Sequence, residues 1–427
     1  MRRYWLTGVW GILLLVATSC QAALAVLTPT PSATLTPTLS PTSQLATVVP
    51  STPEPSALIV WLPDVLFPLD DDSLSAVLAA EVNEFSTQSG IQIELHRKKP
   101  DDVGGILSTL RAAAVVAPGA LPDLTLMRRS DLLAAVSEGL IYPVEGRIAS
   151  AVIADLYPSA LRLGRAEDQL FGLPYLLDFY LTAYRSDTIT LERWTFANIL
   201  NAEVSMAIPA ASAVGLNDVL WLQYISAGGL IPEPESPLNL APGPVLTILN
   251  FYEEMVEANL ITRIVVDYDS PDDYLQLIAD GRLDAGIIST TQLRDLADAE
   301  VPLAFAPVPS PSGDPLTLVD GWMWVIISPN PEQQALSGRF INWMMDSGRH
   351  STYANSIAIP PSQRSSMRRW SFEGLDNDLI SELLRDSPPP MPEVSASSAA
   401  RALQSALTDV LSGDMSASEA AATALSP

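Results

Sequence analysis

The side chains best suited to ligand binding lie in an aromatic stretch near the middle of the chain. Asp178 is flanked there by Tyr175, Phe179 and Tyr180. Carboxylate oxygens accept hydrogen bonds from paired hydroxyl groups, and aromatic rings stack on the C–H faces of sugars. The grouping is therefore suited to a carbohydrate, and packing in a hydrophobic core is an equally good explanation of the rings.

A second candidate group is Asp320, Gly321 and Trp322, which lead into an apolar run. Trp322 and Trp324 alternate along one predicted strand, so their rings share a face of the sheet. At least one of the two rings is expected to pack in the core. Trp322 lies nearer the end of the strand and is the better candidate for a cleft.

Ligands of open α/β sheets bind beyond the carboxyl ends of the strands. Asp64 follows the first predicted strand, and Arg128 and Arg129 follow the third. Paired guanidinium groups could also bind an anionic solute such as a phosphate ester, although side-chain alternation would turn only one of them inward. The predicted ligand-binding residues are Asp64, Arg128, Tyr175, Asp178, Asp320, Gly321 and Trp322.

Sequence motifs for catalysis are missing. The chain has no Gly-x-Ser-x-Gly motif, and the glycine pairs at 104–105 and 228–229 lack the Lys-Ser/Thr sequel of a phosphate-binding loop. Two histidines and one cysteine leave little room for a His- or Cys-based metal site. We predict a protein that is not an enzyme and uses no cofactor or metal. A glycoside hydrolase with a carboxylate pair remains the alternative, because acidic residues abound.

The length and net charge of the chain argue against further classes of protein. The 427 residues include 23 basic and 49 acidic side chains, which gives a net charge of −26. A chain this long can bury a large core without disulfides, and its single cysteine excludes an intramolecular one. Nucleic-acid binding relies on clustered Lys and Arg, so the acidic balance argues against it.

The N-terminus has the pattern of an export signal. Two arginines precede an apolar run that is too short for a comfortable bilayer span, which predicts a signal peptide over residues 1–19. The run ends in Val-Ala-Thr-Ser before Cys20, which resembles a bacterial lipobox and implies lipid attachment at Cys20. An ordinary signal peptide with an incidental cysteine is the alternative. Residues 20–56 are rich in Pro, Thr and Ser and predict a disordered, extended tether.

The folded body begins with apolar runs at 57–62, 91–95 and 121–127, separated by amphipathic segments at 73–85 and 104–116. This alternation of strand and helix predicts an α/β fold with a parallel sheet covered by helices. Short segments along the body resemble one known family in their order and spacing. They are Leu58–Trp61, Leu121–Leu124, Gly139–Val144, Phe171–Tyr175, Tyr184–Asp187, Gly281–Gly286, Gly321–Trp322, Ile359–Pro361 and Leu411–Gly413.

Because these segments occur in this order, between about residues 57 and 425, the chain resembles the family 1 extracellular solute-binding proteins, the receptors of ABC importers. The resemblance implies a two-lobed, periplasmic-binding-protein-like fold with a ligand cleft that closes by hinge motion. It implies a first lobe of residues 57–182 and 306–346 and a second of 183–305 and 347–427. The crossings between lobes are expected near 181–184, 304–307 and 345–348.

The resemblance implies that the protein captures a small solute, above all a sugar or oligosaccharide, and delivers it to the permease subunits of an ABC transporter. The protein is expected to be a monomer outside the cytoplasm, anchored to the membrane by its N-terminal lipid. A ligand sensor for a signalling partner would share this fold. Met127 and Ser130 stand where some sugar receptors of the family carry Trp and Asp, which argues against a maltodextrin as the ligand.

Overall fold

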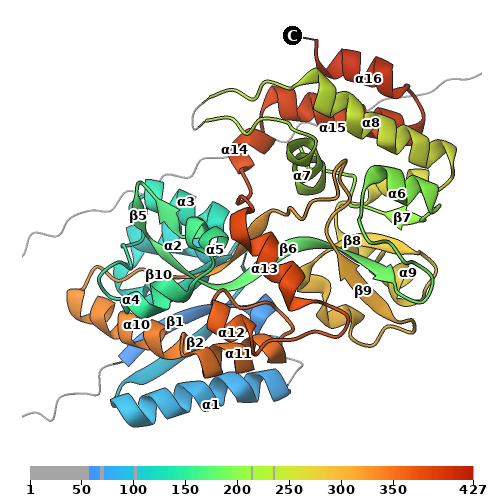
Figure 1. Cartoon of the computed structure of the whole chain (residues 1–427). Helices are drawn as coiled ribbons and strands as arrows, with labels where there is room; N and C mark the ends of the chain where they lie inside the picture. Colours follow the sequence, from blue (N-terminus) through green and yellow to red (C-terminus); the bar gives the residue numbers. More distant parts are fainter. Residues whose placement is uncertain (1–56, 68–71, 101–102, 213–214, 234–235, 427) are drawn as a thin grey trace, which may run out of the picture. The chain divides into compact units, whose positions relative to one another are not determined.

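The computed structural model describes residues 57–67, 72–100, 103–212, 215–233 and 236–426 (Figure 1). The predicted signal peptide, Cys20 and the tether lie outside these described residues. The first half follows the predicted alternation, with β1 (Ala57–Pro63), α1 (Asp72–Ser89), β2 (Gln92–Lys98), α2 (Ile106–Val116) and β3 (Leu124–Met127). Strand β1 pairs in parallel with both β2 and β3, as the pattern predicts.

These strands belong to an eight-stranded mixed sheet of order β2-β1-β3-β10-β6-β8-β7, in which β9 also pairs with β6. Strand β10 (Val319–Ile326) is antiparallel to β3 and to β6 (Gly172–Arg185). The far end of β6 pairs with β8 (Ala285–Ser289) and β9 (Leu303–Ala306), and β7 (Met206–Ala207) extends β8. The 14-residue strand β6 therefore joins both halves of the sheet.

Helices complete the layers on the sheet, and β4 (Arg165–Ala166) and β5 (Gln169–Leu170) form a separate hairpin. The remaining helices are α3 (Arg129–Ser137), α4 (Ser150–Asp155), α5 (Pro158–Leu163), α6 (Phe196–Asn201), α7 (Asp218–Ser226), α8 (Pro242–Glu257), α9 (Leu275–Ala279), α10 (Pro331–Met344), α11 (Ser347–Ser356), α12 (Arg364–Met367), α13 (Asn377–Asp386), α14 (Pro392–Ser395), α15 (Ser398–Ser412) and α16 (Ala417–Ala424).

Two hydrophobic cores form around this sheet. The first contains residues of β1, β3, β10 and α10, such as Leu58, Trp324 and Phe340. The second contains residues of α7, α8, α15 and α16, such as Trp221 and Leu407. Helices α8, α15 and α16 pack together in the region drawn in yellow-green and red in Figure 1. Both cores are stabilised by buried apolar surface, and the first also includes residues of α9, β8 and β9, such as Ile278, Ile288 and Phe305.

Helices α11, α12 and α13 contribute Tyr353, Met367 and Leu384 to the first core, and α15 and α16 belong to the second. The first core also includes Ile288 of β8 and Phe305 of β9, so it spans both halves of the sheet. The lobe boundaries and the crossings expected near 181–184, 304–307 and 345–348 stay predictions.

Candidate functional site

The centre of the candidate site is the Arg128 cluster, which we define as Arg128, Asp178, Asp320 and Trp322. Arg128 stands at the end of β3 and is the N-cap of α3. Its guanidinium donates to Asp178 Oδ2 at 2.8 Å and to Asp320 Oδ2 at 3.5 Å. The same group lies 5.3 Å from the centroid of the Trp322 ring. One cation thus holds two carboxylates and an aromatic ring in place.

The strand register explains why Arg128 is needed. Asp178 on β6 and Asp320 on β10 are direct cross-strand partners, and like charges in that position repel each other. Burial raises the pKa of Asp320, the Arg128 guanidinium opposes the rise, and the Asp178 carboxylate adds to it. Asp178 also accepts a hydrogen bond from the Ser289 hydroxyl at the end of β8. The cluster is therefore a polar site built from the end of β3, the start of β10 and the middle of β6.

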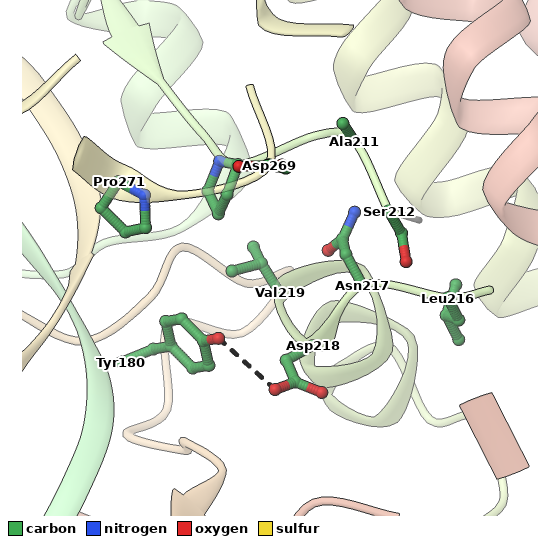
Figure 2. Close-up of a pocket in the computed structure, with 10 residues that line it drawn as sticks. Tyr180, Ala211, Ser212, Leu216, Asn217, Asp218, Val219, Asp269 and Pro271 are labelled. Atoms are coloured by element: carbon green, nitrogen blue, oxygen red, sulfur yellow. Dashed lines mark hydrogen bonds between the residues drawn. The ribbon is translucent and has the colours of Figure 1, made fainter. Parts of the chain in front are cut away.

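A pocket of about 340 Å³ lies beside the cluster (Figure 2). Tyr180, two residues beyond Asp178 on β6, points its hydroxyl at Asp218 Oδ2, 3.4 Å away. Asp218 is the first residue of α7, whose N-cap Asn217 accepts a hydrogen bond from the backbone of Leu220. The pocket is lined by Tyr180, Pro209, Ala211, Ser212, Leu216, Asn217, Asp218, Val219, Asp269 and Pro271.

Asp218 connects this pocket to the Arg128 cluster electrostatically. Burial raises the pKa of Asp218 to about 6, and the negative charge of Asp320 is the next contribution. The charge of Asp178 raises it further, and Arg128 lowers it. The carboxylates of the Arg128 cluster therefore contribute to the raised pKa of Asp218 in the pocket.

Four of the seven predicted ligand-binding residues make up the Arg128 cluster. The other three lie elsewhere or act differently. Asp64 is partly exposed at the start of the short 3-10 helix η1 (Asp64–Leu66), and within the described residues no hydrogen bond or ion pair joins it to the cluster. Gly321 lies between Asp320 and Trp322, where an added Cβ would stand 2.1 Å from the carbonyl oxygen of Leu176. The absence of a side chain at Gly321 lets β10 approach β6 closely.

Tyr175 is a correction to the predicted site. Its side chain is fully buried in the first core, where the ring stacks on His350 at 4.7 Å and on Tyr353 at 5.9 Å. The register of β6 shifts at this point, since Trp322 pairs with Leu176 whereas the next residue of β10 pairs with Pro174. A register shift of this kind redirects the side chain of the unpaired residue. Core packing, the alternative left open for these rings, is the correct explanation for Tyr175.

The two tryptophans of β10 differ in their contacts, and both are buried. Trp324 is 1% exposed and packs against Tyr175 and Phe340, whereas Trp322 is 5% exposed and contacts Arg128. The cleft role of Trp322 stays a prediction.

Three residues of the site were missed at the level of sequence. Ser289 is the last residue of β8, so the expectation that ligands bind beyond the carboxyl ends of strands could have identified it. Asn217 and Asp218 have the pattern of a helix N-terminus, which is common and does not identify a ligand site. Within the described parts of the chain, no group of His, Cys, Asp and Glu could hold a metal ion.

Comparison with known proteins identifies the family. The family model of the bacterial extracellular solute-binding proteins matches residues 80–368. The chain belongs to this family. No curated protein matches the sequence significantly. In the described residues, no helix combines the length and the apolar character needed to cross a membrane.

Solved structures of solute-binding proteins share the two-lobed fold at low sequence identity. The cyclic alpha-maltosyl-1,6-maltose binding protein of Arthrobacter globiformis aligns with a TM-score of 0.67 at 14% identity, over 87% of this chain and 97% of its own. The maltose-binding protein of Listeria monocytogenes, in complex with maltose, gives 0.66 at 13%, over 87% and 96%. A family 1 solute-binding protein of Alicyclobacillus acidocaldarius gives 0.65 at 17%, over 87% and 97%.

Proposed function

We propose that this solute-binding protein captures a sugar or oligosaccharide outside the cytoplasm and delivers it to the permease subunits of an ABC transporter. The observation that carries the proposal is the Arg128 cluster, in which two carboxylates, a guanidinium and the Trp322 ring lie together beside a pocket. Carboxylates paired with arginine are oriented acceptors for sugar hydroxyls. The similar structures that contain maltose or maltotetraose support a carbohydrate.

The ligand-binding part of the proposal is tested by thermal shift of the purified protein against sugars, polyols and phosphate esters. A bound sugar at a hundredfold excess over its dissociation constant should add about 2.7 kcal/mol to the free energy of unfolding. Asp178→Asn should weaken that sugar's affinity, because the amide accepts fewer hydrogen bonds than the carboxylate. A panel in which only phosphate esters bind would contradict the sugar proposal. Chemically altered sugar after incubation would instead favour a glycoside hydrolase.

Membrane anchoring is a separate part of the proposal and rests on Cys20, which lies outside the described residues. Cys20→Ala should leave the protein unprocessed or release it from membranes, because the thiol that would carry the lipid is gone. Fractionation of cells and mass spectrometry of the mature N-terminus measure both effects. A Ser19→Ala variant, which keeps a small residue before the cysteine, serves as the control and should remain anchored. Parent-like fractionation and acylation of Cys20→Ala would exclude the lipid anchor.

A further inference from the structure

Asp178 is the carboxylate of the Arg128 cluster that several elements of the fold hold in place. It lies on β6, and its Oδ2 accepts a hydrogen bond of 2.8 Å from Arg128 at the end of β3. Its Oδ1 accepts hydrogen bonds from the hydroxyl groups of Ser289, the last residue of β8, and, at 3.4 Å, of Thr290. Both oxygens of this carboxylate therefore have donors from the protein, so the side chain cannot turn without breaking a hydrogen bond.

The Thr290 hydroxyl serves the backbone of β6. Its oxygen accepts a hydrogen bond of 3.2 Å from the amide of Phe179 and lies 3.3 Å from the carbonyl oxygen of Leu177. At this point β6 changes its pairing partner, since Phe179 pairs with β10 and Tyr180 pairs with β8. Thr290 is fully buried and completes the hydrogen bonds of the backbone at this junction, so its role is structural.

The Ser289 hydroxyl is held in a defined direction. Ser289 is the N-cap of the short 3-10 helix η5 (Thr290–Gln292), and its hydroxyl oxygen accepts a hydrogen bond of 3.2 Å from the amide of Thr291. Its own amide donates to Oε1 of Gln292 at 2.9 Å, which closes a capping box. An ionised carboxylate only accepts hydrogen bonds, so Ser289 gives its single hydroxyl proton to Asp178. The capping box therefore aims this donor at Oδ1 of Asp178.

Arg128 is the charged group of the cluster that is most accessible to a solute. Its side chain is 32% exposed, whereas that of Asp178 is 13% exposed. Of its contacts with the two cluster carboxylates, the one with Asp178 is shorter, at 2.8 Å against 3.5 Å for Asp320. Because charge-assisted hydrogen bonds are strong at such short distances, the position of Asp178 has the larger influence on the position of the guanidinium.

We propose that Ser289 is a positioning residue for sugar binding: its hydroxyl fixes the Asp178 carboxylate, which in turn fixes the Arg128 guanidinium before the sugar binds. This inference rests on the proposed function, since it adds a residue that prepares the same site. Ser289 needs no contact with the sugar in this role. Groups that are already ordered in the free protein lose less conformational entropy on binding, so removal of the Ser289 hydroxyl lowers the affinity.

Isothermal titration of the purified protein measures the effect on affinity. The probes are maltose, cellobiose, xylobiose and trehalose, together with every other sugar that raises the melting temperature in the thermal-shift panel. Ser289→Ala should weaken the binding of a sugar roughly three- to tenfold, and Ser289→Thr, which keeps a hydroxyl, should bind like the parent. The matched control is Ser205→Ala, which removes a serine–aspartate hydrogen bond of 2.6 Å, to Asp284 at the opposite end of β8. This control should keep the parent affinity.

Nuclear magnetic resonance of the free protein measures the positioning without any sugar. Nitrogen relaxation of the Arg128 Nε–H group, whose signal is identified with Arg128→Lys, reports how ordered the guanidinium is on the picosecond-to-nanosecond timescale. The order parameter should fall in Ser289→Ala and keep the parent value in Ser289→Thr and Ser205→Ala. Arg185, whose Nε donates to Asp187 at 3.2 Å outside the cluster, is the internal reference and should not change.

The outcomes separate this inference from the function on which it rests. If Ser289→Ala keeps the parent affinity or the parent order of Arg128, the inference is wrong and sugar capture stands. If a folded Ser289→Thr behaves like Ser289→Ala, the hydroxyl is not the cause and the inference is also wrong. If thermal melts show that Ser289→Ala does not fold, Ser289→Cys, which has a similar size and a weaker donor, takes its place in both measurements. If no sugar binds the parent, the proposed function fails, and the inference fails with it.

Discussion

Gly321→Ala should lower the free energy of unfolding by roughly 3 kcal/mol, even though it adds a single methyl group. Gly321 has a φ of +157° and lies on β10 directly against β6. The new Cβ would stand 2.1 Å from the oxygen and 3.1 Å from the carbonyl carbon of Leu176. Both contacts are with backbone atoms of a strand in the middle of the sheet, so no flexible side chain can move aside.

Urea unfolding of the two proteins measures this loss. The control is Gly119→Ala in the short 3-10 helix η2 (Pro118–Ala120), where an added Cβ would meet no atom within 4 Å. Alanine is a better helix former than glycine, so the control should be neutral or slightly more stable than the parent. Equal losses in the two variants would show that the approach of β10 to β6 is not the cause. The same clash should also disturb Asp320 and Trp322, the neighbours of Gly321 in the sequence.

Acidification should destabilise the protein by about 3 kcal/mol through the protonation of His350 alone. The ring is fully buried, with Nε2 2.6 Å from the carbonyl oxygen of Tyr175 and Nδ1 2.9 Å from Oε1 of Gln363. Burial lowers the pKa of His350 from 6.5 to about 4, and the hydrogen bonds to Gln363 and Tyr175 oppose this only in part.

The direction of this pH effect on stability follows from proton uptake on unfolding. Between these two pKa values the unfolded chain binds a proton at His350 and the folded chain does not, so stability rises with pH in that window. The contribution is complete above about pH 6.5 and is lost progressively toward pH 4. Urea unfolding at several pH values should therefore show a shallower pH dependence in His350→Gln than in the parent.

His96→Gln is the matched control for this experiment. His96 is the other histidine of the chain, and its side chain is 52% exposed at the edge strand β2. Its replacement should leave the pH dependence of the parent between pH 4 and 6.5. If His350→Gln keeps the full slope as well, buried carboxylates and not His350 govern the acid response.

Part of the fold could be predicted because its signals are local. Strands β1, β2 and β3 lie where the apolar or alternating segments at 57–62, 91–95 and 121–127 predict them, and their alternation with helices predicts the parallel arrangement. Arg128 and Asp320 were found because residues at strand ends meet at an edge of the sheet. The ligand-binding role of these residues stays a prediction.

The remaining features depend on contacts between distant segments. Tyr175 looked like a cleft residue because the register shift that turns it inward arises only when β6 pairs with β10. Asp218 lies 40 residues from Asp178 in the sequence and joins the site because α7 begins opposite Tyr180. Helices α11 to α13 pack into the first core together with Ile288 of β8 and Phe305 of β9. No periodicity within a single segment contains that information.

Strand β6 has a consequence for how the chain acquires its structure. It pairs at one end with β10 and at the other with β8 and β9, so both cores depend on the same 14 residues. The partners are separated from it by more than a hundred residues, which gives a high contact order and favours slow folding. During synthesis from the N-terminus, β3 and β6 are made before β10, the strand that lies between them in the sheet. Both strands therefore lack this pairing partner until β10 has been synthesised. The two lobes should then unfold in a single cooperative transition, since neither lobe can lose β6 without exposing the core of the other.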